Sequence, residues 1–360
     1  MSVTLSHIGF YCSSLSKGGL ELNTIRYADY MQGAGFKVTL FLVDDSPMFH
    51  IAKQKGLTVV AIQRNRRYAD LKKAWRLMQH SRTFQITTWW FRDPRDMDLM
   101  AWLKSFAPKI NLIYHQAMQI NHPKKDWVHR WRMSKIDHWI CLSAYLKEQV
   151  IQFTTVKQEN IHVIPLALPD AQQASPYTSG AFHALVVGRW DEQKNQHTVI
   201  NALQLIHKKY PQVHLTFVGE STLGEGQHYE KENKKKVRHL DLQNHVQFLP
   251  FTFDLTSIFA GSHVLIVPSL NETFGMVTIE GMRAGLPLLG ANTGGTLDLI
   301  VQNQCGDTFA PTDAGMLAEK WEQLIVNHEQ RTQWGKNARH AFENNYWIDH
   351  QIPEWKKRIV

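Results

Sequence analysis

Cysteine is scarce in this chain of 360 residues. Its three cysteines, Cys12, Cys141 and Cys305, lie far apart and form no CxxC pair. This odd, scattered set predicts neither a disulfide framework nor a zinc site. The sequence also contains no run of about 18 apolar residues that would form a membrane-spanning helix, and no basic segment followed by an apolar one at its N-terminus. These absences lead us to expect a cytoplasmic protein.

Apolar residues are plentiful, at 43% of the sequence, and charged residues make up 20%. This composition is typical of a folded protein and excludes a disordered one. A chain of this length exceeds what one hydrophobic core usually serves, so we expect two domains of roughly 150 to 200 residues each.

Positive charge is concentrated in the first half of the chain. The first 170 residues hold 23 Lys and Arg against 13 Asp and Glu, whereas the remainder holds 17 against 19. Two basic clusters lie at 64–76 and 124–135, the second interleaved with Trp127 and Trp131. Such clusters fit anionic lipid, an acidic acceptor or nucleic acid, and equally a solvated helix face; the two Trp residues favour a membrane surface but also fit a core. The residues that we assign to an acceptor or membrane surface are Arg64, Arg66, Arg67, Lys124, Lys125, Trp127, Arg130 and Trp131.

Short apolar runs alternate with polar segments of helix length along the whole sequence. In the first half the runs are Val3–Tyr11, Lys37–Val43, Leu57–Ile62, Gln85–Trp90, Ile110–His115 and His138–Ser143. In the second half they are Ala184–Val187, Leu215–Val218, Val246–Leu249, Val264–Val267 and Leu286–Leu289. This alternation predicts parallel sheets covered by helices on both faces.

The pattern restarts after a small-residue stretch, which divides the chain. We expect an α/β protein of two doubly wound, Rossmann-like domains at 1–168 and 181–340, joined by a linker at 169–180. Residues 341–360 read as a helix that packs back on the first domain. Ligands bind beyond the carboxyl ends of such strands, so we expect a site in the cleft between the two domains.

Basic side chains occupy a strand-to-helix turn in the second domain. Gly188 and Arg189 follow an apolar strand, and Lys194 opens the next helix. A diphosphate fits there, because Arg grips two phosphate oxygens, Lys adds a point charge, and the helix N-terminus is positive.

A more specific segment runs from Pro268 to Pro287. It places Glu272 in a loop after a strand and Glu280 about two turns further on, along a helix that begins near Phe274–Gly275. A carboxylate accepts hydrogen bonds from two hydroxyls, as the vicinal diol of a sugar or ribose presents them. Taken alone, each glutamate could be a solvated side chain or an acidic residue near a helix N-terminus. Such a role would explain neither Gly275 nor the basic turn at 189–194.

The run from Ser269 to Glu280, followed by Ala284–Pro287 and Gly294–Gly295, closely resembles the signature of retaining GT-B glycosyltransferases of family 4. The resemblance extends over nearly the whole chain. Gly188–Arg189 with Lys194–Asn195 resembles the diphosphate-binding pair of that family, and Val218–Gly219 resembles its nucleotide-contacting strand end. Its N-terminal glycine loop is matched by Lys17, Gly18, Gly19 and Glu21, and its donor-sugar histidine by His115.

The resemblance implies a role for each matching residue. Glu280 would hold the ribose hydroxyls, Glu272 would hold the transferred sugar, and Arg189 with Lys194 would neutralise the leaving diphosphate. His115 would orient the sugar. The implied catalytic residues are therefore His115, Glu272, Arg189 and Lys194. The implied donor-binding residues are Gly18, Gly19, Gly188, Gly219, Leu249, Thr273, Phe274, Gly275, Met276 and Glu280.

The expected reaction is metal-independent hexosyl transfer with retention of configuration. Two cations at the diphosphate would make a metal ion or other cofactor unnecessary, and the triplet Asp96–Met97–Asp98 is interpreted as a chance DxD spacing. We expect a nucleotide sugar, UDP-linked by family frequency, and a hydroxyl of a glycan or lipid-linked acceptor in envelope polysaccharide or lipopolysaccharide synthesis. Peripheral contact with an anionic inner membrane face is a further hypothesis, and nucleic acid is not an expected partner.

Two other readings remain open from the sequence. A GT-B nucleotide-sugar epimerase or phosphorylase would have the same architecture and the same kind of phosphate-binding residues. A non-enzymatic protein that binds an anionic surface would explain the basic first half but not the site in the second.

Overall fold

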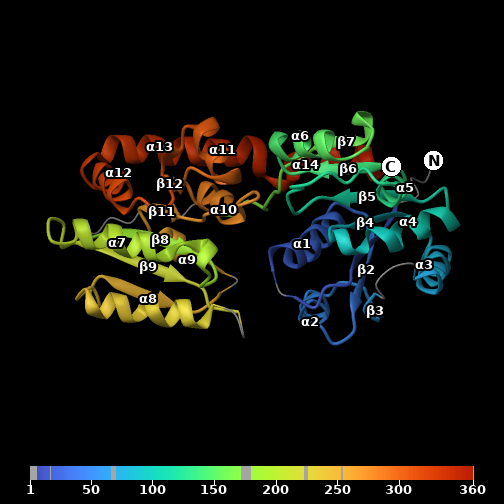
Figure 1. Cartoon of the computed structure of the whole chain (residues 1–360), viewed down its shortest axis with the longest axis horizontal. Helices are drawn as coiled ribbons and strands as arrows, with labels where there is room; N and C mark the ends of the chain where they lie inside the picture. The colour runs from blue at the N-terminus through green and yellow to red at the C-terminus, as the bar shows by residue number, and fades with distance from the viewer. Residues whose placement is uncertain are drawn as a thin grey trace. The chain divides into compact units, whose positions relative to one another are not determined.

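The computed structural model describes residues 6–16, 18–65, 70–171, 180–222, 226–252 and 254–359. The chain forms two compact units (Figure 1). Unit 1 contains residues 1–165 together with 348–360, and unit 2 contains residues 166–347. The chain therefore divides three residues before the expected end of the first domain, and the expected linker at 169–180 falls within unit 2, with 172–179 outside the described residues.

Unit 1 is built on a parallel sheet of seven strands, in the order β3-β2-β1-β4-β5-β6-β7. Its strands are β1 (His7–Cys12), β2 (Lys37–Val43), β3 (Val59–Ile62), β4 (Ile86–Phe91), β5 (Asn111–His115), β6 (His138–Cys141) and β7 (Ile161–Val163). Its helices are α1 (Gly19–Gly33), α2 (Pro47–Gln54), α3 (Leu71–Phe84), η1 (Pro94–Asp96), α4 (Met97–Phe106), α5 (Trp127–Met133), α6 (Ala144–Phe153), η2 (Gln158–Asn160) and α14 (Ile348–Ile359).

Aromatic residues fill the centre of unit 1. Trp89 and Trp90 of β4 are fully buried, on opposite faces of the sheet because successive side chains alternate along a strand. The Trp90 ring stacks on Phe10 at 5.1 Å between ring centroids. Gly9 makes room for Trp89, because a Cβ at residue 9 would lie 3.0 Å from the Trp89 ring.

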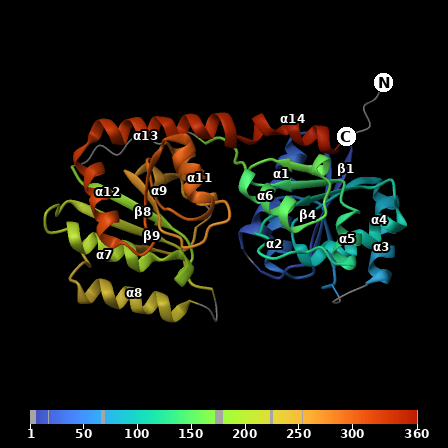
Figure 2. The same cartoon turned by 45° about the horizontal axis from the view of Figure 1, so that its top comes forward.

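Helix α14 returns to unit 1 after the whole of unit 2 has intervened in the sequence (Figure 2). Its fully buried Trp355 lies 4.3 Å from Trp90 between ring centroids, and Thr88 donates a hydrogen bond to the carbonyl of Ile359 at 3.2 Å. The helix expected over 341–360 is not continuous. Residues 342–346 form a π-helical turn, η4, which stays in unit 2, and only the part from residue 348 onward belongs to unit 1.

Unit 2 repeats the doubly wound pattern with six parallel strands, in the order β10-β9-β8-β11-β12-β13. The strands are β8 (Phe182–Val187), β9 (Val213–Val218), β10 (Val246–Leu249), β11 (Val264–Val267), β12 (Leu288–Ala291) and β13 (Gly306–Phe309). The helices are η3 (Glu192–Lys194), α7 (Gln196–Ile206), α8 (Gln227–His239), α9 (Thr256–Ala260), α10 (Met276–Ala284), α11 (Gly294–Asn303), α12 (Ala314–Val326), α13 (His328–Ala341) and η4 (Phe342–Tyr346).

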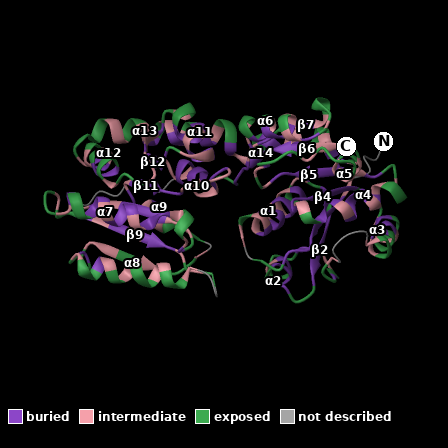
Figure 3. Cartoon of the chain, in the orientation of Figure 1, coloured by how far each residue is buried: buried purple, intermediate pink, exposed green. Residues whose placement is uncertain are grey.

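Both sheets are buried between layers of helices, while helices such as α8 keep an exposed outer face (Figure 3). In each unit the strand order reverses beside the first strand, between β1 and β4 and between β8 and β11. The loops that follow these strand pairs are the places where doubly wound sheets bind ligands. No helix in the described part of the chain is long and apolar enough to span a bilayer.

Candidate functional site

The carboxyl ends of β8, β9 and β10 are held together by backbone hydrogen bonds. The Gly188 amide donates to the Val218 carbonyl, and the Gly219 amide donates to the Leu249 carbonyl, both at 3.0 Å. Gly219 has a φ of +144°, and a Cβ there would lie 2.1 Å from the Gly188 carbonyl oxygen. Only glycine fits this contact, which brings together three residues that the sequence assigns to donor binding: Gly188, Gly219 and Leu249.

Asn195 fixes the turn that carries Lys194. It is buried and left-handed, with a φ of +54°, a conformation that Asn tolerates better than most residues. Its Nδ2 donates to the carbonyls of Pro268 and Pro311, and its Oδ1 accepts from Thr198 at 2.8 Å. The turn is thereby tied to the loop after β11. Asn195 has no separate role in the sequence-based prediction, although its place directly after Lys194 is the signal for one.

Lys194 and Glu272 form an ion pair. The ammonium Nζ donates to Oε2 of Glu272 at 2.6 Å, and the two side chains are 29% and 20% exposed. Gly188 lies against the same lysine, because a Cβ there would be 3.7 Å from Lys194 Cδ. The structure thus brings together two residues from the segments that follow strands β8 and β11, at the point where the strand order reverses.

Arg189 is more open to solvent. Its side chain is 54% exposed, its Nη1 donates to Thr222 at 2.9 Å, and its Nη2 lies 3.6 Å from the Asp191 carboxylate. Its backbone is anchored, since Gln196 donates to the Arg189 carbonyl at 2.7 Å. The guanidinium therefore remains accessible on a rigid turn.

The loop at 272–275 packs against the glycine pair at the start of α11. A Cβ on Gly294 would lie 2.2 Å from the Glu272 carbonyl oxygen, and a Cβ on Gly295 would lie 2.7 Å from the Thr273 carbonyl oxygen. The Gly295 amide donates to the Glu272 carbonyl at 2.8 Å. In the sequence Gly294 and Gly295 are part of a family motif with no assigned function. The structure shows that they allow this close packing.

Two helices begin next to this loop. Gly275 caps α10 with a φ of +88°, and a Cβ there would lie 2.7 Å from Thr278 Oγ1. Helix α10 begins at Met276 and α11 at Gly294, so their positive N-terminal ends lie next to the segment that carries Glu272, Thr273 and Phe274. Free helix amides at such ends favour anions and other oxygen acceptors. Glu280 is half-buried, one turn along α10.

His115 lies in unit 1, fully buried at the end of β5. The aromatic rings of Tyr27, Trp90 and Trp355 surround it, with centroids 5.0, 5.6 and 5.3 Å away. Arg92 donates to His115 Nδ1 at 2.9 Å, while Nε2 is buried without a hydrogen-bond partner among the described residues. Burial and the charge of Arg92 lower the His115 pKa well below its usual value, so the ring is neutral and Nε2 carries its proton.

The glycine loop of unit 1 leads into helix α1, with Gly18 as the N-cap residue. Gly18 donates to Glu21 at 3.0 Å, and a Cβ at Gly18 would lie only 3.0 Å from the same carboxylate oxygen. Gly19 is exposed, and a Cβ there would meet nothing within 4 Å. Lys17, the third residue of this predicted loop, lies outside the described residues.

The side chains of the second basic cluster, at 124–135, differ in their exposure to solvent. Lys125 and Arg130 are exposed, and Trp127 is 80% exposed. Trp131 instead packs on Trp102 at 4.6 Å between ring centroids, and Lys124 is half-buried. In the first cluster Arg64 is exposed, whereas Arg66 and Arg67 lie outside the described residues.

Asp96 and Asp98 face different partners. Asp96 is buried and accepts from Ser13 and from Asn65 Nδ2, the latter at 2.7 Å, whereas Asp98 accepts from Arg132 at 3.1 Å. Within the described ranges, no three His, Cys, Asp or Glu side chains are grouped as metal ligands.

Two family models match successive parts of the chain. The model described as Glycosyltransferase Family 4 matches residues 17–171, and that described as Glycosyl transferases group 1 matches residues 170–341. The glycogen synthase of Mycobacterium tuberculosis is 29% identical over 222 residues, which are 61% of this chain and 53% of that protein. The capsular polysaccharide biosynthesis glycosyltransferase CapM of Staphylococcus aureus is 25% identical over 224 residues, 58% of this chain and 57% of that protein. The chain thus spans about half the length of these curated relatives.

Solved structures share the fold over nearly the full length. Anabaena HepE, crystallised with UDP and glucose, superposes with a TM-score of 0.77, at 22% identity, over 97% of this chain and 99% of HepE. The two doubly wound units and the paired family models confirm the fold class and the resemblance. The chain belongs to family 4 of the GT-B glycosyltransferases.

Proposed function

We propose that this protein is a retaining, metal-independent glycosyltransferase that moves a hexose from a UDP-sugar to an acceptor hydroxyl. The observation that carries the proposal is the Lys194–Glu272 pair, which stands beside the N-terminal ends of α10 and α11 where the strand order of unit 2 reverses. Cations and helix ends suit a diphosphate, and a carboxylate suits sugar hydroxyls. The Anabaena structure with UDP and glucose supports a UDP-linked donor.

In this proposal the bond between the anomeric carbon and the diphosphate breaks while a bond to the acceptor oxygen forms on the same face. The acceptor proton moves to the departing phosphate oxygen. Positive charge develops on the anomeric carbon and negative charge on the leaving group, so Arg189 and Lys194 stabilise the transition state more than the bound substrate. No protein nucleophile is needed.

The other site residues bind and orient the donor. Glu272, with the backbone amides of Phe274, Gly275 and Met276, holds the transferred sugar, and Glu280 holds the ribose hydroxyls. Gly19, where a Cβ would meet nothing within 4 Å, leaves room for the donor to approach the backbone closely, and Gly219 lets its strand end pack on the Gly188 carbonyl. His115 acts as a neutral hydrogen-bond donor through Nε2, because its low pKa excludes a role as a general acid at neutral pH.

We further propose that the acceptor belongs to envelope polysaccharide or lipopolysaccharide synthesis and lies at an anionic membrane face. The exposed Lys125, Trp127 and Arg130 support such a contact, since Lys and Arg meet lipid phosphates and indole rings favour the headgroup region. Co-sedimentation with anionic and with neutral vesicles at low salt tests it. Equal recovery of the protein with both kinds of vesicle would refute the contact.

The donor is tested first, by the thermal stabilisation of the protein with a panel of nucleotide sugars. A donor that binds the folded state raises the melting temperature by mass action, and we expect this for a UDP-sugar. The anomeric configuration of the product then tests retention, and full activity in EDTA tests metal independence. Stabilisation followed by an altered free nucleotide sugar, without transfer, would indicate an epimerase, and no stabilisation by any nucleotide sugar would indicate an anionic-surface binder.

A further inference from the structure

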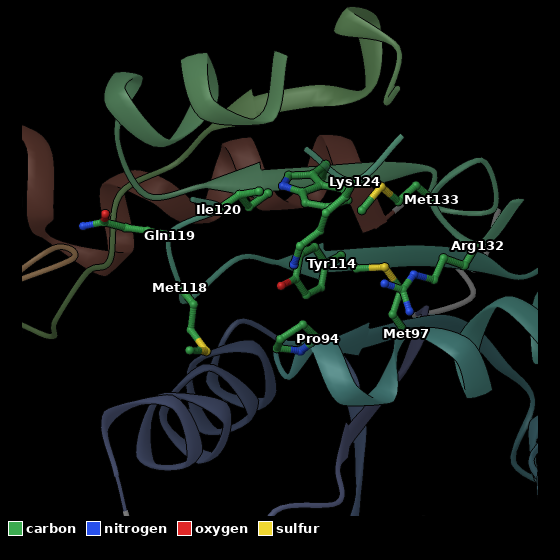
Figure 4. A pocket seen from close by; sticks show the side chains of 10 residues that line it. Pro94, Met97, Tyr114, Met118, Gln119, Ile120, Lys124, Arg132 and Met133 are labelled. Atoms are coloured by element: carbon green, nitrogen blue, oxygen red, sulfur yellow. The ribbon is translucent and has the colours of Figure 1, made fainter. Parts of the chain in front are cut away.

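A pocket of unit 1 lies at the carboxyl ends of β4, β5 and β6, the edge at which such sheets bind ligands (Figure 4). Its cavity volume is about 30 Å³, and it opens to solvent, so a bound group can extend beyond it. Much of its wall is apolar, and three methionines, Met97, Met118 and Met133, contribute to it. Methionine is flexible and polarisable, and it adapts to apolar ligands of irregular shape.

Besides Gln119, the polar or charged side chains of Tyr114, Lys124 and Arg132 line the same pocket. Figure 4 shows the Lys124 side chain extending toward the Tyr114 hydroxyl, with the Arg132 guanidinium beside Met97. Tyr114 is only 3% exposed, and burial raises the pKa of its hydroxyl, which keeps its proton. Among the described residues this hydroxyl has no hydrogen-bond partner, so a donor that lines the pocket is left unused.

Positive charge at the pocket exceeds negative charge. Arg132 Nη1 donates to Asp98 at 3.1 Å, but its Nε is buried without a partner in the described residues. Lys124 Nζ makes no hydrogen bond or ion pair there either, and its pKa is lowered by burial and by the charge of Arg132. Arg132 therefore has Asp98 as its carboxylate partner while Lys124 has none among the described residues, and a bound anion would supply the missing partner.

The wall of the pocket is rigidly built. Gln116 is fully buried and donates from Nε2 to the Met118 carbonyl at 2.8 Å, while its Oε1 accepts from Trp139 at 2.9 Å. Gln149 accepts from the Ile120 amide at 3.2 Å. The amide of Lys124 donates to the Phe153 carbonyl at 2.7 Å. These bonds hold the loop that carries Met118 and Lys124 in one conformation.

We propose that this pocket binds a phosphate group of the acceptor through Tyr114, Lys124 and Arg132, with an apolar part of the same molecule against the methionines. The identification of the ligand as the acceptor rests on the proposed function. The pocket itself indicates that the ligand carries both a phosphate and an apolar chain. The combination favours a lipid-borne phosphate over a soluble sugar phosphate, because a soluble sugar phosphate has no apolar chain for the methionines to cover.

Isothermal titration of the full-length protein tests the proposal with three probes. Dodecyl phosphate carries both features, dodecyl maltoside carries the apolar chain alone, and glucose 1-phosphate carries the phosphate alone. We expect dodecyl phosphate to bind at least about tenfold more tightly than either of the others. Equal binding of the two dodecyl compounds would overturn the phosphate role, and equal binding of the two phosphates would overturn the lipid-borne source.

Variants then locate the binding. Tyr114→Phe removes only an unpartnered hydroxyl, and Lys124→Gln removes only an unpaired charge, so both should fold. Each is expected to weaken dodecyl phosphate binding about tenfold or more, whereas Lys109→Gln, the same change at an exposed lysine outside the pocket, leaves it unchanged. Unaltered affinity in both pocket variants would overturn the proposal.

The same variants separate this proposal from the proposed function. If a UDP-sugar still stabilises the protein while the pocket variants bind dodecyl phosphate normally, the pocket assignment is wrong and the donor site stands. If no nucleotide sugar binds while dodecyl phosphate binding is lost in Tyr114→Phe and Lys124→Gln, the pocket stands and the transferase proposal is wrong.

Discussion

The ammonium of Lys194 lies 2.6 Å from the carboxylate of Glu272. The sequence alone assigns the lysine to the leaving diphosphate and the glutamate to the sugar, so two proposed roles meet in one pair. Without a donor each group neutralises the other. A bound donor would replace this contact on both sides, because its phosphates attract the lysine and its hydroxyls donate to the glutamate.

The first prediction concerns the stability of this pair. Glu272→Gln leaves a partly buried cation without a charged partner and should cost on the order of 1–3 kcal/mol of unfolding free energy. The double variant Lys194→Gln/Glu272→Gln should be more stable than the sum of the two single effects implies. Urea unfolding of the wild type and the three variants measures the coupling. Strictly additive effects would contradict it.

The second prediction concerns Gly219. Gly219→Ala places a Cβ 2.1 Å from the Gly188 carbonyl oxygen and holds an alanine at a φ of +144°, so it should destabilise unit 2 by roughly 2 kcal/mol or more and weaken donor binding. Gly33→Ala, the same substitution in open space on α1, should be neutral or stabilise the protein. Thermal melts with and without the UDP-sugar distinguish the two. Similar melting temperatures would show that the turn at Gly219 tolerates a side chain.

The third prediction separates binding from turnover. Arg189→Ala should lower kcat by about 10² to 10³ with little change in melting temperature, because the side chain is half exposed and acts on the leaving group. Glu280→Gln should chiefly raise the dissociation constant of the donor. Arg238→Ala, an exposed arginine on α8, serves as the control for loss of charge. Steady-state kinetics with titrated donor measures both effects, and full turnover in Arg189→Ala would refute the leaving-group role.

The fourth prediction concerns the pH dependence of stability. Burial raises the pKa of Asp96 to about 7, despite hydrogen bonds from Ser13. The folded state therefore holds a proton that the unfolded state has released, and Asp96 contributes most stability below about pH 4 and loses it as the pH rises through about 7. His115, whose pKa is lowered, acts in the opposite direction below its usual pKa.

Comparison with Asp96→Asn isolates the aspartate. The variant minus wild-type difference in unfolding free energy should increase between pH 4 and pH 8, by a few kcal/mol at most. Urea unfolding at several pH values measures it. A constant difference would mean that Asp96 is already ionised at low pH, held so by Ser13, Asn65 and the nearby charge of Lys73.

Most of the fold was predictable because buried parallel strands read as apolar runs. The expected bounds of β2, β10 and β11 are those observed. Strand β13 was missed because only Phe309 of its four residues is buried, and β7 because it has three residues. The break between α13 and α14 was missed as well. Trp347 has an extended backbone there, but no proline or glycine next to it in the sequence indicates the end of a helix.

The site was predictable residue by residue but not in its contacts. Motif spacing singled out Lys194 and Glu272, yet no local pattern joins residues 78 positions apart. The role of Gly294 depends on its approach to the Glu272 backbone, which only the folded chain reveals. Likewise the basic run around Trp131 gave no sign that Trp131 packs on Trp102 while Arg132 turns toward a pocket, because α5 is too short to show a clear periodicity.

The return of α14 to unit 1 sets an order of events during synthesis. Unit 2 is one continuous stretch, whereas unit 1 needs residues 348–359 to cover Trp90, Tyr27 and His115. At translation rates of about 5–20 residues per second, the ribosome takes roughly 10 to 40 s to pass through unit 2. During that interval a nascent chain carries an uncovered aromatic surface. The speed of translation across unit 2 therefore determines how long this surface is open to aggregation or to chaperones.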